Sequence, residues 1–312
     1  MRIFFYFLII FLTGCSTKIN LADYRPVYAP KNENAPKKLN AEIKKISLVK
    51  FPKYYYRSLN LNEIATNDLL NSLENLKFVK VLRVIDETEI KNEIKAAEIS
   101  KETDDNIGAD YLLKGKIISS TYTPQYHKGY YYYVKYKGKK IRKYSPPYYS
   151  YTACTQISLD IYTLPEFIIK NSLNAKGCSY YSDSSSIRHY YPELIIKSVK
   201  KTIENLTASL KTFFAPKGYI YEIRTDGDDL IAKITLGKNQ GMREDTKLNV
   251  YRLKKDKITN EVEKIKIGEA KVSNLIFDNS CWVVLDLNEN IKPQIGDMVI
   301  PSFNYSFWDL FK

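Results

Sequence analysis

The chain has 312 residues, with 48 lysines and arginines against 35 acidic residues, so its formal net charge is +13. This length suffices for two domains of ordinary size, and the charge favours anionic polymers or acidic partners. Only two histidines and four cysteines are present, and the cysteine spacing fits no zinc pattern, so we expect no metal site.

The N-terminus has the order of an export signal. Arg2 gives a short positive start, and residues 3–12 are an unbroken apolar run. A membrane-spanning helix needs about 20 such residues, so the run has the length of a signal peptide instead. It ends in Leu12-Thr13-Gly14-Cys15, which resembles the lipobox of bacterial lipoprotein precursors. The resemblance implies that residues 1–14 are removed and that Cys15 carries lipid, palmitate included. The alternative is a cleaved secretory signal with an incidental cysteine.

The residue after Cys15 bears on localisation. Ser16 stands there, and not the aspartate that retains lipoproteins on the inner membrane in the best-known sorting rule. We therefore expect the periplasmic face of the outer membrane, and export excludes a nucleic-acid partner. Residues 15–42 are polar and contain three prolines. They are predicted to form a lipidated tether, which at about 3.3 Å per residue reaches roughly 80 Å from the membrane.

Residues 43–215 are predicted to form one domain of strands and helices. Apolar residues recur at helical spacing after Asn60 and from Pro192, and Asp86 with Glu89 makes a capping box for a helix between them. Apolar runs and alternating patterns indicate the strands. The strands are expected at 46–51, 78–85, 107–117, 152–163 and 167–178.

One stretch of this domain resembles known families. Ile107-Gly-Ala-Asp-Tyr-Leu-Leu-Lys-Gly115, set in this order of elements, is similar to the domain shared by the TolB N-terminal, CsgG and FlgT middle families. The resemblance covers about half of the chain. It implies an α/β (α+β) fold, a place in the bacterial envelope and no catalysis.

A second domain is expected at 216–302. Short strands separated by glycine turns favour a small, closed, all-β and SH3-like barrel. Leu236-Gly-Lys-Asn-Gln-Gly241 and Gly296-Asp297 resemble the C-terminal domain of FlgT, in which these glycines shape turns. An aromatic tail follows at 303–312, and we expect it to fold back onto the barrel or to bind a partner.

Three cysteines remain after Cys15. Cys154 and Cys178 lie on the two arms of a hairpin that turns at Leu164-Pro165, so a disulfide between them is possible in an oxidising compartment. Equal distances from the turn would place Cys154 near Ala175, so the bond requires a bulge or an offset. Cys281 would then be the free thiol.

The most unusual segment is the insertion at 122–151, which holds eleven tyrosines, seven lysines or arginines and no acid. Alternation over 130–137 predicts a strand with tyrosines on both faces, a turn at Lys137-Gly138-Lys139 and a return strand that ends at Pro146-Pro147. Tyrosine offers a large contact area with few rotors to freeze, so we expect a protein-contact or glycan-stacking surface. A membrane-inserted hairpin and an ordinary exposed hairpin are the alternatives. The candidate interface residues are Tyr130, Tyr131, Tyr132, Tyr133, Tyr136, Lys139, Lys140 and Arg142.

No pattern indicates catalysis, so we expect neither an enzyme nor a cofactor. The two domains together resemble FlgT, a ring protein around the flagellar rod, with a lipobox and tether in place of the N-terminal domain of that family. The resemblance implies a flagellar motor accessory required for motility, an oligomer or ring component whose partners are basal-body or disk proteins, with peptidoglycan a further candidate. The alternatives are a component of a CsgG-like secretion channel and an LpoB-like activator of peptidoglycan synthesis.

Overall fold

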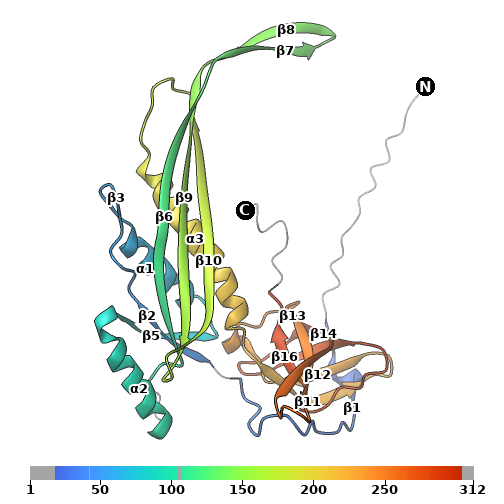
Figure 1. Ribbon diagram of the computed structural model, residues 1–312. Coiled ribbons are helices and arrows are strands. Elements are labelled where there is room, and N and C mark those ends of the chain that lie inside the picture. Colours follow the sequence, from blue (N-terminus) through green and yellow to red (C-terminus); the bar gives the residue numbers. More distant parts are fainter. Residues whose placement is uncertain (1–17, 42, 104–106, 304–312) are drawn as a thin grey trace, which may run out of the picture. The chain divides into compact units, whose positions relative to one another are not determined.

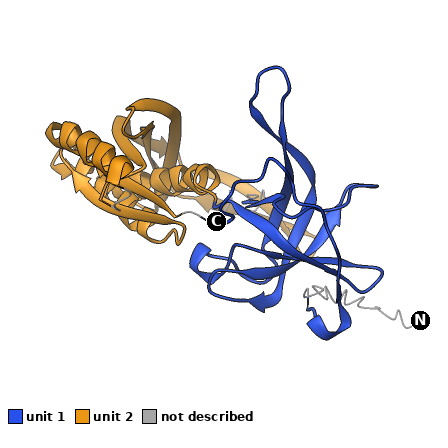
Figure 2. Cartoon of the chain, turned by 90° about the horizontal axis from the view of Figure 1, so that it is seen from below, with its two compact units in different colours: residues 1–42, 216–312 blue, residues 43–215 orange. Residues whose placement is uncertain are grey.

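The computed structural model describes residues 18–41, 43–103 and 107–303. They belong to two compact units (Figures 1 and 2). One unit is Ile43–Ala215, and the other joins the segment before it to the residues from Pro216 onward. The predicted signal peptide (1–14), the predicted lipid acceptor Cys15 and the tail from residue 304 lie outside the described residues.

The unit Ile43–Ala215 is built on a five-stranded mixed sheet in the order β10-β9-β6-β2-β5. β2 is parallel to both of its neighbours, whereas β6, β9 and β10 are antiparallel to one another. The predicted elements are confirmed, and the unit has an α+β architecture. Its strands and helices are β2 (Lys44–Val49), β3 (Tyr55–Tyr56), β4 (Leu59–Asn60), α1 (Leu61–Glu74), β5 (Val79–Ile85), α2 (Ile90–Thr103), β6 (Tyr111–His127), β7 (Tyr130–Tyr136), β8 (Lys139–Ser145), β9 (Tyr148–Thr163), β10 (Ile168–Asp183) and α3 (Pro192–Phe213).

The long helix α3 explains why one face of this sheet is buried. Proline at its first turn suits the helix start, and its apolar stripe of Ile195, Val199 and Ile203 is buried against β9, β10 and α1. The inward residues of β9 alternate with more exposed ones, as a half-buried strand requires. Gly177 on β10 lets the helix approach, because a Cβ there would meet the backbone of Thr202.

The helix α2 packs in a second cluster around Ala97, Val49 and Leu112. The predicted capping box before it is present, since the backbone N–H of Asp86 donates to Glu89 Oε2 at 2.8 Å. The capping residue therefore fixes where the chain turns from β5 into the helix.

The strand β6 is longer than predicted. Residues 107–117 were expected to hold it, but it continues to His127, paired with β9 throughout and with one register shift after Ile117. Residues 118–127 carry no clear apolar alternation, because neither face of this outer part is buried over its whole length. The predicted insertion at 122–151 is therefore partly the outer end of the β6–β9 hairpin, and β7 and β8 form a separate two-stranded ribbon beyond it (Figure 1).

The second unit contains the predicted closed antiparallel barrel. Its strands follow the order β11-β12-β15-β14-β13-β16, and β16 pairs with β11 through Gly218 and Val299 to close the ring. Alternate residues fill its centre with Ile220, Val250 and Val283, all fully buried. The strands are β11 (Gly218–Thr225), β12 (Leu230–Ile234), β13 (Lys247–Lys255), β14 (Val262–Ile276), β15 (Cys281–Leu287) and β16 (Met298–Pro301).

The prediction that residues 15–42 form a free tether is wrong for its described part, 18–41. This segment, which we call the strap, lies on the barrel, where β1 (Arg25–Pro26) pairs with β11. Ile19 is buried with Trp282 and Ile231 on the outer side of the barrel wall. No regular apolar spacing in the strap predicts this docking, because its contacts are a few apolar side chains around Ile19, the short pairing with β11 and one buried polar cluster.

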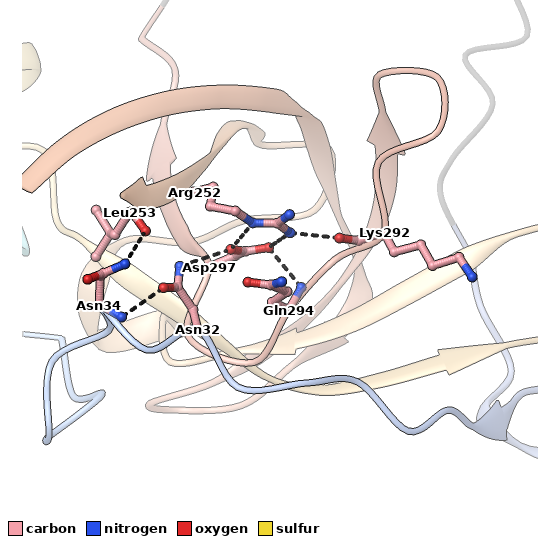
Figure 3. Close-up of polar contacts among 7 residues, drawn as sticks. All are labelled: Asn32, Asn34, Arg252, Leu253, Lys292, Gln294 and Asp297. Atoms are coloured by element: carbon pink, nitrogen blue, oxygen red, sulfur yellow. Dashed lines mark hydrogen bonds and ion pairs between the residues drawn. The ribbon is translucent and has the colours of Figure 1, made fainter. Parts of the chain in front are cut away.

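That polar cluster, which we call the clasp, surrounds a fully buried carboxylate (Figure 3). Arg252 donates to both oxygens of Asp297, from Nε at 3.1 Å and from Nη2 at 2.8 Å. From the strap, Asn32 donates through Nδ2 at 3.4 Å to the same carboxylate, and its Oδ1 accepts from the backbone of Asn34 at 2.9 Å. The clasp thus holds the middle of the strap against the loop that leads into β16.

Candidate functional site

The candidate site is the tyrosine arm, by which we mean residues 122–151. Its outer part is the β7–β8 ribbon, in which Tyr130 pairs with Ser145 and Tyr136 with Lys139. Lys137 and Gly138 both have positive φ, at 47° and 78°, as the tight turn of a two-residue hairpin requires. The predicted turn and return strand are confirmed.

The ribbon exposes tyrosine on both faces. Opposed residues of an antiparallel pair share a face, so Tyr130, Tyr132 and Tyr136 lie with Ile141 and Lys139. The other face carries Tyr131, Tyr133 and Lys135 with Lys140, Arg142 and Tyr144. Among the ribbon tyrosines the exposed fraction runs from 39% to 66%. All eight candidate interface residues are therefore brought together on one exposed element.

The cations of the arm are not neutralised within the described chain. The arm contains no acid, and none of its seven lysines and arginines forms an ion pair there. Instead the Arg142 guanidinium lies 3.7 Å from the centre of the Tyr131 ring, which itself packs against Tyr144 at 4.9 Å. This stacking orders Arg142 while leaving its charge available to an acidic group.

The root of the arm, by which we mean Tyr122 and Tyr151 with the residues that they contact, is a cluster of packed tyrosines. Tyr151 is 1% exposed and accepts a hydrogen bond from the backbone of His189 at 2.9 Å. Tyr122 accepts one from the backbone of Tyr191 at 3.1 Å. The Tyr191 hydroxyl donates to Asp183 at 2.5 Å, and this bond raises the pKa of Tyr191 and lowers the pKa of Asp183. This tyrosine cluster joins β6, β9 and β10 to the segment before α3.

This root corrects the interpretation of 122–151 as one uniform surface. Tyr151 belongs to the core and Tyr122 is half-buried, because both lie on the strand faces that meet the segment before α3. Composition alone could not separate them from the exposed tyrosines. The exposed surface is the ribbon together with partly exposed residues such as Tyr126, which is 47% exposed.

The arm stands on strands that are joined covalently. The structure places a disulfide between Cys154 on β9 and Cys178 on β10, with their Cα atoms 4.1 Å apart. The required offset comes from the four residues 164–167 between the strands and from a register shift between Ile169 and Asn171. Cys281 is free, and burial raises the pKa of its thiol to about 12.

Neither a membrane helix nor a metal site is found in the described residues. No helix there is long and apolar enough to cross a bilayer. Within the same ranges, no three side chains of histidine, cysteine, aspartate or glutamate gather as metal ligands would.

Comparison with known proteins leaves the family open. No family model and no curated protein matches the chain. Among solved structures, a PelC dodecamer from Paraburkholderia phytofirmans is 11% identical, with 59% of this chain and 94% of that chain covered and a TM-score of 0.27. A hypothetical protein from Chlamydia trachomatis is 7% identical over 55% of this chain and 97% of that one, with a TM-score of 0.34. A protein from Xanthomonas campestris is 8% identical over 59% and 90%, with a TM-score of 0.28. Likenesses at these scores establish neither a shared fold nor a shared assembly.

Proposed function

We propose that the protein is a non-catalytic lipoprotein of the outer membrane that builds or stabilises an assembly on the periplasmic face, with the tyrosine arm as its contact surface. The observation that carries the proposal is the ribbon itself. It presents exposed tyrosines on both faces, together with cations that form no ion pair with any described residue, and it lies outside the sheet and the core of its unit.

The chemistry of the ribbon favours an acidic protein partner. A surface kept only for solubility would mix charges of both signs and would avoid this much ring area. Tyrosine and arginine are enriched among the residues that dominate binding energy, where one truncation commonly costs about 2 kcal/mol or more. The lysines attract acidic groups over the screening length of about 8 to 10 Å and give the interaction a salt dependence.

The assembly that we propose is the flagellar motor, with basal-body or disk proteins as partners and this chain as an oligomeric or ring component. This part rests on the FlgT-like motifs around Gly241 and Gly296 and on the Gly-Ala-Asp motif at 108–110. It makes motility the phenotype to measure.

The test changes Tyr130, Tyr131, Tyr132 and Tyr133 to serine together. We expect unchanged folding and membrane fractionation, with loss of complex recovery and of motility. The matched control changes Tyr28, Tyr55 and Tyr180 to serine, because these rings are 95%, 61% and 73% exposed but lie outside the arm. If the ribbon variant assembles and swims like the parent, the ribbon is not the contact surface.

The same variant separates two other functions. A CsgG-like channel component would lose membrane conductance, although the seven residues of β7 fall short of the 9 to 11 that a membrane strand needs and cations occupy both faces. An LpoB-like activator would lose capture of a penicillin-binding protein and stimulation of peptidoglycan synthesis. Either result with normal motility would replace the flagellar proposal.

A further inference from the structure

The strap docks almost from its first described residue. The backbone N–H of Ile19 donates to the side chain of Asn274 at 2.9 Å, and the Ile19 side chain is 8% exposed. Trp282, Ile231 and Val284 form the apolar patch beneath it on the outer wall of the barrel. The strap is therefore seated on the barrel from residue 19.

The distance in sequence from this seat to the lipid acceptor is short. Only Ser16, Thr17 and Lys18 separate Cys15 from Ile19. A chain extends by at most about 3.6 Å per residue, so the two Cα atoms are within about 14 Å of each other in any conformation. The reach of roughly 80 Å that the sequence predicted for a tether is therefore limited to this distance.

The rest of the strap is also bound to the barrel, so it adds no free length between the barrel and Cys15. Arg25 and Pro26 pair with β11, and the backbone of Val27 donates to Ile223 at 3.0 Å. Further along, Lys31 bridges to Ile295, and the clasp holds Asn32. Separation of the barrel from the lipid would require these contacts to break together.

We infer that the barrel face around Ile19 lies against the membrane surface into which the lipid on Cys15 inserts. The inference rests on the proposed lipidation of Cys15. The exposed side chains around this seat suit a headgroup region. Lys18 is exposed, Phe277 is 49% exposed, and the ammonium of the partly exposed Lys233 lies 5.5 Å from the Phe277 ring. Amine and aromatic groups of this kind are common at lipid interfaces.

Energy transfer to the bilayer tests the inference with the full lipidated chain. A donor dye is placed at Phe277→Cys, directly after β14, or at Ile258→Cys, in the turn before β14. The two sites are 49% and 90% exposed, and the 15 residues of β14 separate them by a distance on the order of 40 Å. The buried Cys281 and the disulfide-bonded pair leave the new thiol as the reactive one. The vesicles contain phosphatidylethanolamine and phosphatidylglycerol, with an acceptor dye on the headgroups.

We expect strong transfer from position 277 and weak transfer from position 258. Twelve glycine and serine residues inserted between Thr17 and Lys18 add about 20 Å of flexible reach, so most of the transfer at position 277 should be lost while the strap stays docked. Equal transfer from the two positions, or no loss on insertion, would overturn the inference.

Flotation of the same samples keeps the two proposals apart. The parent should float with the vesicles, and Cys15→Ala should not. A parent chain that does not float refutes the lipid anchor and with it the membrane-facing barrel. A parent chain that floats with equal transfer from both positions refutes only the orientation. The inserted variant should float like the parent, since it retains Cys15.

Discussion

Loss of the clasp should destabilise the barrel unit strongly. The Asp297 side chain is fully buried and the Arg252 side chain is 26% exposed. Breaking a buried ion pair from one side costs about 3 to 5 kcal/mol, because the remaining charge is left without its partner. For Asp297→Ala we expect the lower end, about 3 kcal/mol, since water reaches part of the guanidinium that remains.

A double-mutant cycle measures the interaction energy between Asp297 and Arg252. Among the described residues, Arg252→Met leaves the buried carboxylate with the Asn32 and Gln294 donors and no cation, so we expect a cost of about 3 to 4 kcal/mol. With both residues changed, neither charge of the pair remains. The loss of unfolding free energy in the double variant should therefore be smaller than the sum of the two single losses by about 2 kcal/mol or more. Additive effects would refute the reasoning.

The measurement is urea unfolding followed by tryptophan fluorescence. A Trp308→Phe background leaves Trp282, in the barrel unit, as the reporter. Glu269→Ala is the matched control, because it breaks the exposed contact of Glu269 with Lys266 at 2.8 Å. Screening by water makes such a surface pair weak, so its unfolding midpoint should stay at the parental value.

Three further predictions concern the arm and the tail. Cys178→Ser in a Cys281→Ser background should lower the free energy of unfolding of its unit by about 3.5 kcal/mol, the loop-entropy value for a separation of 24 residues, and equal urea midpoints would contradict it. The bond from Tyr191 holds the pKa of Asp183 below its ordinary 3.8, so its stabilisation is present above pH 3.8 and is lost as the pH falls through the folded pKa. In Tyr191→Phe the urea midpoint should therefore fall less steeply as the pH is lowered below 3.8 than it does in the parent. An equally steep fall in both would count against this bond. Truncation after Ser302 should lower either the melting temperature of the barrel unit or the recovery of complexes, and no change in both would leave the aromatic tail without a role.

Much of the fold could be predicted because its signals are local. The apolar stripe of α3, the Asp86 capping box and the turn at Gly138 each act within a few residues, and each is present. The barrel strands were predictable for the same reason, since glycine turns separate short alternating runs.

The parts that sequence reasoning missed depend on distant contacts. Ile19 bonds to a residue 255 positions away, and Asn32 to one 265 positions away, so no local pattern marks the strap as docked. The offset that aligns Cys154 with Cys178 comes from the four residues 164–167 between the strands and from one register shift, neither of which any period of the sequence encodes. Within the arm, the same residue type is core at Tyr151 and surface at Tyr133, so composition could not separate the root from the ribbon.

The docking of the strap also sets an order of events during biogenesis. In a chain exported from its N-terminus, as proposed, residues 18–41 reach the periplasm first, whereas Trp282 and Asp297, on which they settle, arrive among the last. On the proposed lipidation of Cys15, the strap beside it therefore has no barrel to dock on while the modifying enzymes act. The two proposals together thus predict that Cys15 matures before the barrel closes, and that folding of the last strand brings the barrel to the bilayer.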